Sequence, residues 1–146
     1  YNHSKVKAMV NLTKGEGFGR PLLEFSLTKK PIITTNWSGH KDFLDEKFTT
    51  MLPGTMADVH PSAANQWLLK ESQWFNINTE VASRAMKDIF KNYKKYLEGS
   101  RKQTQYMKDN WSFDKMTEKL NILLPKVEAS PKTNQLELPK LKKLEI

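Results

Sequence analysis

The chain has 146 residues, a formal net charge of +8 and no cysteine. This length suits one domain with a modest core. The lack of cysteine excludes disulfides, thiolate zinc sites and a thiol nucleophile, and it favours a reducing, cytoplasmic location. The positive charge permits binding to a polyanion without establishing it. No apolar run approaches the roughly 18 residues that a membrane span needs.

The first half of the chain predicts two or three parallel strands that alternate with short helices. Strands are expected over 7–12 and 31–35, and a third ends near Leu52, before the turn signal Pro53-Gly54. A helix over 21–28 separates the first two strands, because Pro21 suits a first helical position and Pro31 follows two lysines as a breaker. A short helix over 41–45 is expected next.

The second half is predicted to be mainly helical. His60-Pro61-Ser62 favours a helix that runs through Leu69, and Trp67, Trp74 and Trp111 are interpreted as packing residues. A long helix over 79–108 carries an apolar stripe and a lysine-rich, solvated face, with Gly99-Ser100 as its expected break. Ser112 caps a last helix over 113–124, stopped by Pro125.

The chain is expected to divide at Pro125. Residues 1–125 form the α/β domain and 126–146 form a linker and tail, whose final leucines are expected to cover an exposed sheet edge. The sequence has no initiator Met and begins almost inside a strand. We therefore expect it to be the C-terminal piece of a longer protein.

A glycine-rich loop lies between the first strand and the first helix, where Lys14-Gly15-Glu16-Gly17-Phe18-Gly19-Arg20 leads into Pro21-Leu22-Leu23-Glu24. Strand, loop and helix in this order place main-chain N–H groups and a positive helix end against a phosphate. Glu24 falls one turn into the helix, and its side chain leans back toward the loop. Two carboxylates around an amide cradle suit a diphosphate with hydroxyls at both ends, as in a nucleotide sugar.

These residues resemble the signature of the retaining nucleotide-sugar glycosyltransferases with the GT-B fold. Glu16 and Glu24, with seven residues between them, enclose the Gly-Phe-Gly and Pro-Leu-Leu sequences of that signature. Residues 30–35 and 38–44 are similar to the family's next strand and its glycine-bearing loop, and 110–113 are similar to the opening of its last helix, in altered order. The resemblance covers roughly residues 4–124.

The resemblance implies an α/β fold with part of a doubly wound, Rossmann-like parallel sheet, namely the C-terminal donor-binding domain, followed by long C-terminal helices. It implies that Glu16 contacts the donor sugar in a catalytic role and that Glu24 binds the nucleotide ribose. The other donor-binding positions it implies are Gly17, Phe18, Gly19, Arg20 and Leu23. Arg20 departs from the apolar residue common in the family, so a phosphate contact and simple solvation both stay open.

Each of these residues also has a structural interpretation. Glu24 is a first-turn acid that the helix dipole favours, and Glu16 is a loop acid that Lys14 or Arg20 could pair with. Lys14, Ser38 and His40 form a second group of candidates, because loop 36–40 should lie beside the glycine loop at the carboxyl edge of the sheet. A lone histidine is more often structural, and the indole of Trp37 could stack on a base or a sugar.

The expected function is transfer of a sugar from a nucleoside-diphosphate donor to a carbohydrate or lipid-linked acceptor with retention. No cofactor and no metal are expected, since no Asp-x-Asp or ligand cluster occurs. The family's N-terminal acceptor domain and its basic diphosphate pair match no residue here, so this piece alone is expected to be inactive. Another GT-B enzyme (a glycan synthase, phosphorylase or epimerase) stays open, as does peripheral membrane contact. A basic nucleic-acid-binding module is the least favoured alternative.

Overall fold

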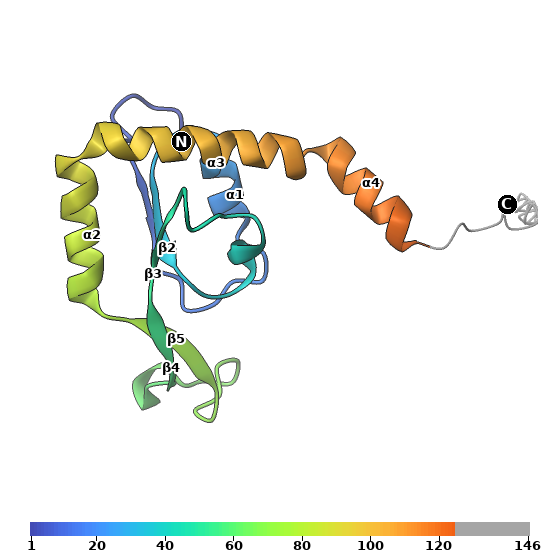
Figure 1. The fold of residues 1–146 in the computed structure, drawn as a ribbon. Helices are drawn as coiled ribbons and strands as arrows, with labels where there is room; N and C mark the ends of the chain where they lie inside the picture. The colour runs from blue at the N-terminus through green and yellow to red at the C-terminus, as the bar shows by residue number, and fades with distance from the viewer. Residues whose placement is uncertain (125–146) are drawn as a thin grey trace, which may run out of the picture.

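The computed structural model describes residues 1–124, which form a mixed α/β fold (Figure 1). The elements in chain order are β1 (Met9–Asn11), α1 (Arg20–Ser26), β2 (Ile32–Thr35), the 3₁₀ turn η1 (Gly39–Asp42), β3 (Thr50–Leu52), β4 (Gly54–Asp58), the 3₁₀ turn η2 (Pro61–Ala63), β5 (Gln73–Ile77), α2 (Thr79–Lys91), α3 (Tyr93–Asn110) and α4 (Phe113–Leu123).

The centre of the fold is a parallel three-stranded sheet with the order β1-β2-β3. Met9 pairs with Ile32 on one side of β2, and Ile33 pairs with Thr50 on the other. All four residues of β2 are buried, as expected for a central parallel strand that helices cover on both faces. The α/β class and the three predicted parallel strands are therefore confirmed, with each strand shorter than its predicted range.

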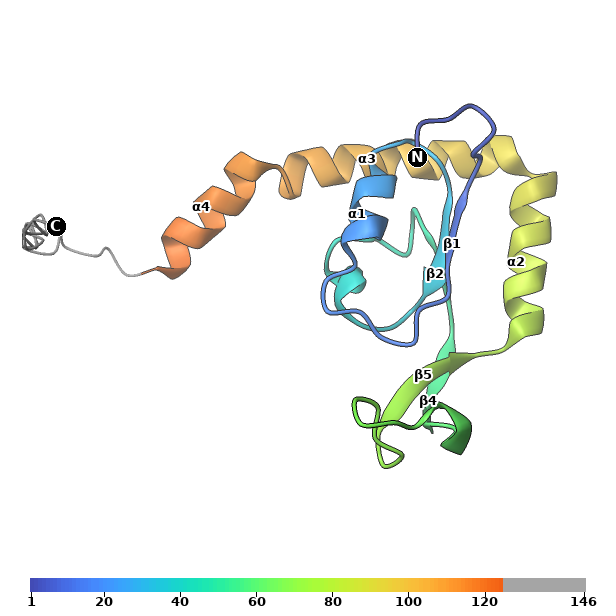
Figure 2. The ribbon, with the colours of Figure 1, turned by 180° about the vertical axis from the view of Figure 1, so that it is seen from behind.

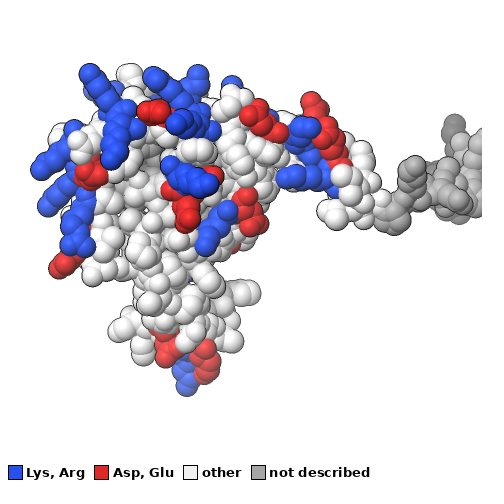
Figure 3. Space-filling model, in the orientation of Figure 1, with Lys and Arg blue, Asp and Glu red and all other residues white. Residues whose placement is uncertain are grey.

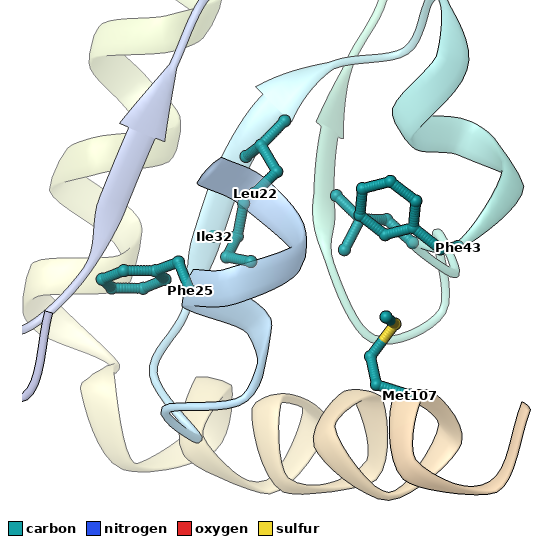
Figure 4. Close-up of a cluster of buried hydrophobic side chains, with 6 residues drawn as sticks. Leu22, Phe25, Ile32, Phe43 and Met107 are labelled. Carbon is teal, nitrogen blue, oxygen red and sulfur yellow. The ribbon is translucent and has the colours of Figure 1, made fainter. Parts of the chain in front are cut away.

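Helices cover both faces of this sheet, and each face has its own apolar core (Figure 2). On one face α1 and α3 pack around the cluster drawn in Figure 4, which contains Leu22, Phe25, Ile32, Phe43, Leu44 and Met107. On the other face α2 packs on β2 and β3 through Ile33, Leu52, Ala82 and Ile89. The consecutive residues Ile32 and Ile33 of β2 pack in opposite cores, because successive side chains of a strand point to opposite faces.

The predicted break in the long helix is at the wrong position. The helix turns at Asn92, whose φ of −113° and ψ of 30° end α2 and begin α3. The Asn92 side-chain amide donates to the Asp88 carboxylate at 2.6 Å, and the Tyr96 hydroxyl donates to the same group. These bonds lower the pKa of Asp88, and the same carboxylate raises the pKa of Tyr96 to about 12. Gly99 lies inside α3, where a Cβ would come within 3.1 Å of the Phe48 carbonyl oxygen.

The predicted helix over 62–69 is also wrong. Only the short turn η2 forms there, and the surrounding residues build an antiparallel hairpin in which Gly54 pairs with Ile77 and Asp58 with Gln73. Residues 73–77 carry the aromatic and β-branched side chains typical of a strand. Asn78 then caps α2, because its side-chain oxygen accepts from the Glu80 N–H at 2.8 Å. The short helix expected over 41–45 is the 3₁₀ turn η1.

The last helix, α4, extends away from the body of the fold (Figure 1). Its predicted cap is confirmed, since the Ser112 hydroxyl accepts from the Lys115 N–H at 3.4 Å. The linker and tail predicted over 126–146, including the expected cover for a sheet edge, lie outside the described residues. No helix within residues 1–124 is both long and apolar enough to cross a membrane.

Candidate functional site

The glycine-rich loop joins the carboxyl end of β1 to the start of α1, as predicted. Gly19 ends the loop in the left-handed region, with a φ of 84°, and acts as the residue before α1. Its carbonyl accepts the first bonds of the helix, from the N–H groups of Leu22 at 2.9 Å and Leu23 at 3.1 Å. Pro21 is the second helical residue, one position later than predicted. The loop therefore opens at the sheet edge where ligands of open α/β folds bind.

The loop after β2 is clamped to the glycine loop. The Ser38 hydroxyl accepts from the Glu16 N–H at 2.8 Å and also donates to the Glu16 carbonyl, which receives the Gly39 N–H at 3.2 Å. A Cβ on Gly39 would lie only 1.9 Å from the Gly17 carbonyl oxygen, so only glycine fits there. The prediction that these two loops lie side by side is confirmed. Because Ser38 already accepts the Glu16 N–H, that amide is not free to bind a ligand.

The Glu24 carboxylate lies on α1 with Arg20 as its neighbour. The Arg20 guanidinium donates through Nε to Oε1 of Glu24 at 2.7 Å, one helical turn away. This bond raises the pKa of Arg20. The Arg20 side chain is 83% exposed, so the pair adds little stability. Within residues 1–124 the Glu16 carboxylate makes no hydrogen bond or ion pair, and it is thus the less constrained of the two acids.

The side chains of Phe18 and Leu23 anchor the site to the core. The Phe18 ring packs against Phe43, with centroids 5.1 Å apart, and against Trp111 at 6.2 Å. Leu23 packs at the margin of the α1–α3 core. Both side chains thus position the loop and the helix, and any contact between a ligand and Phe18 at this position would use its main chain or its exposed ring edge.

His40 lies inside the fold. Its side chain is fully buried, and its Nε2 lies 2.6 Å from the Thr35 carbonyl oxygen. A Cβ on Gly19 would meet the His40 Cβ at 3.0 Å, so the start of the His40 side chain lies directly against the end of the glycine loop. His40 is therefore a supporting residue, in line with its structural interpretation. Within the described chain, His40 Nδ1 and Asn36 Oδ1 are buried without a hydrogen-bond partner.

An aromatic wall flanks the glycine loop, and the sequence alone did not predict it. The Lys14 ammonium lies 4.1 Å from the ring centre of Trp74 and bonds to the side-chain oxygen of Asn76. The Phe75 N–H donates to the Lys14 carbonyl at 3.0 Å, and the Phe75 ring stacks on Trp37 with a centroid distance of 5.7 Å. Strand β5 supplies this wall, and the aromatic, β-branched run at 73–77 was the signal that could have located it.

The described residues hold no group of three His, Asp or Glu side chains that could bind a metal ion. Two cavities lie away from the glycine loop. One, of about 470 Å³, lies between residues 46–51 and α3, and an apolar one of about 380 Å³ lies between β1 and α2. Comparison with known proteins adds no assignment, since no family model, curated protein or solved structure matches the chain.

Proposed function

We propose that the chain is the donor-binding part of a retaining, metal-independent glycosyltransferase. The observation that carries the proposal is the glycine loop between β1 and α1, with one acid in the loop and another one turn into the helix. The proposal also specifies the fold: the three-stranded sheet is part of a doubly wound, Rossmann-like domain of the GT-B type. The intact enzyme transfers a sugar from a nucleoside diphosphate to a carbohydrate or lipid-linked acceptor.

The loop amides and the helix start supply the electrostatic part of this function. Main-chain N–H groups of residues 17–19 and the N-terminal end of α1 face the diphosphate and stabilise the charge that grows as the sugar bond breaks. Glu24 orients the ribose and Glu16 orients the donor sugar. Ligand binding requires the Arg20 guanidinium to share Glu24 or to turn toward a phosphate oxygen, where its planar fork fits well.

Another enzyme of the GT-B type, such as a glycan synthase, phosphorylase or sugar-nucleotide epimerase, would use the same donor cradle. The acceptor-binding and diphosphate-binding partners that the family resemblance implies match no residue of this chain. The proposal for these 146 residues therefore concerns donor binding, and catalysis belongs to the intact enzyme. Labelled-donor transfer that retains the anomeric configuration would separate a transferase from its relatives.

The test is calorimetric titration of the chain with UDP-, GDP- and ADP-sugars, with Glu24→Ala beside the wild type. Loss of a charged hydrogen bond to the ribose should weaken binding about 10- to 100-fold, since such bonds contribute about 1.5–3 kcal/mol. The melting temperature should change little, because the Arg20–Glu24 pair is exposed.

Glu46→Ala is the matched control, because Glu46 is an exposed acid that lines the cavity between residues 46–51 and α3. It should bind donor as the wild type does. Equal affinity of the wild type and Glu24→Ala for every donor, or no binding of any nucleotide sugar by the wild type, would contradict the proposal.

A further inference from the structure

Trp37 presents one face of its indole to solvent beside the glycine loop. Its side chain is 42% exposed, and the opposite face stacks on Phe75 with only 8° between the two rings. Phe75 itself is buried at 7% exposure. The indole is therefore a flat apolar surface with a rigid backing, at the edge of the sheet where the candidate site lies.

Trp37 is fixed relative to Glu16 from two directions. Its neighbour Ser38 bonds to both main-chain groups of Glu16, and its stacking partner Phe75 bonds through the main chain to Lys14. The close approach of Gly39 to Gly17 holds the same loop in place. The indole thus lies beside residues 14–16 and is preorganised, so little conformational freedom is lost when a ligand covers it.

We propose that Trp37 forms the subsite for the donor's sugar ring, an inference that rests on the proposed function. The face of an indole carries partial negative charge and packs against positively polarised edges and C–H groups, which the apolar face of a hexose offers. Trp37 is anchored at the Glu16 end of the loop, the end that the proposed function assigns to the sugar. The ribose end is marked by Glu24, on α1. The structure therefore favours the sugar over the base as the group that covers the indole.

The experiment compares each nucleotide sugar with its free nucleoside diphosphate, using UDP-glucose against UDP, GDP-mannose against GDP and ADP-glucose against ADP. Dissociation constants are measured by calorimetry for the wild type, Trp37→Ala and Trp37→Phe. For the pair that the wild type prefers, Trp37→Ala should lose at least about fivefold in affinity for the nucleotide sugar and stay within twofold for the free nucleotide. Trp37→Phe keeps a ring on Phe75 and should retain most of the wild-type preference.

Trp67→Ala is the matched control, because Trp67 lies in the β4–β5 connection and is 86% exposed. It should leave both constants unchanged. An equal loss of affinity for the sugar nucleotide and the free nucleotide in Trp37→Ala would place the base on the indole and overturn the subsite. Unchanged binding in Trp37→Ala, or a wild type that binds the nucleotide without preference for its sugar, would overturn it as well. Failure of the wild type to bind any of the six compounds would instead count against the proposed function.

Discussion

Gly39 lies at a position where packing leaves no room for a side chain. Its missing side chain makes room for the Gly17 carbonyl oxygen, which would lie 1.9 Å from a Cβ. Gly15 is a natural comparison, because a Cβ there would meet nothing within 4 Å. The two glycines belong to the same pair of loops, yet only one is required by packing.

Gly39→Ala should therefore lower the free energy of unfolding by about 1–3 kcal/mol, the usual cost of forcing extra atoms into a packed site. Gly15→Ala should stay within about 0.5 kcal/mol of the wild type. Chemical denaturation followed by circular dichroism measures both. Equal stability of the two variants would mean that the loops are not clamped together.

At the level of single residues, the sequence predicted part of the candidate site. The positions of Glu16, Glu24 and the glycines relative to a strand end and a helix start followed from local pattern alone. The neighbourhood of Ser38 followed from a general rule about parallel strands. The pairing of Arg20 with Glu24 could not be predicted from the sequence. A guanidinium at this position can reach either a phosphate or a carboxylate, and the sequence does not show which of the two it binds. The stacking of Trp37 on Phe75 joins residues far apart in the chain, which periodicity cannot predict.

At the level of elements, α3 holds the core together through one side chain in particular. Met107 is 2% exposed and packs in the cluster of Figure 4, between α1 and the residues after β2. Met116 on α4 is 40% exposed and serves as its comparison. The two methionines have the same chemistry and differ in burial.

Met107→Ala should cost about 2–5 kcal/mol of stability, from lost apolar burial and the cavity that remains. Met116→Ala should fall within about 0.5 kcal/mol of the wild type. Thermal melts and urea titrations of the two variants provide the measurement. A small effect of Met107→Ala would indicate that α3 does not close this core.

The elements differ in how well the sequence predicted them. The parallel strands were recognised because short apolar runs next to proline and glycine are distinctive. The β4–β5 hairpin was missed because its connection, residues 59–72, is long, and His60-Pro61-Ser62 imitates a helix start. The bend at Asn92 was missed because glycine was taken as the breaker. The bend carries a polar cluster in which Asn92 and Tyr96 both donate hydrogen bonds to Asp88.

For the whole molecule, the charge is unevenly distributed. Figure 3 shows that basic side chains gather over α2 and α3. Those that are exposed there include Arg84, Lys87, Lys91, Lys94, Lys95, Arg101 and Lys102. This basic face is the feature that would support the alternative of nucleic-acid binding. The glycine loop lies on another part of the molecule.

Binding to duplex DNA should be weak and unspecific if this face is only a solvated helix surface. We expect a dissociation constant no tighter than about 10⁻⁶ M at physiological salt, with a steep linear fall of log affinity against log salt concentration. Fluorescence anisotropy over a salt series measures it, with the favoured nucleotide sugar as the comparison. Tight, sequence-dependent binding that survives 0.2 M salt, roughly the upper end of such a series, would revive the alternative.

The rings of Phe18, Phe43 and Trp111 form a chain of contacts whose importance reaches beyond the core. Phe18 belongs to the glycine loop, and Trp111 immediately precedes the cap of the outlying helix α4. A displacement of that helix would therefore be passed to the glycine loop through these tilted and edge-on ring contacts, without passing along the sheet. A change in the position of α4 is therefore expected to change the position of the glycine loop as well.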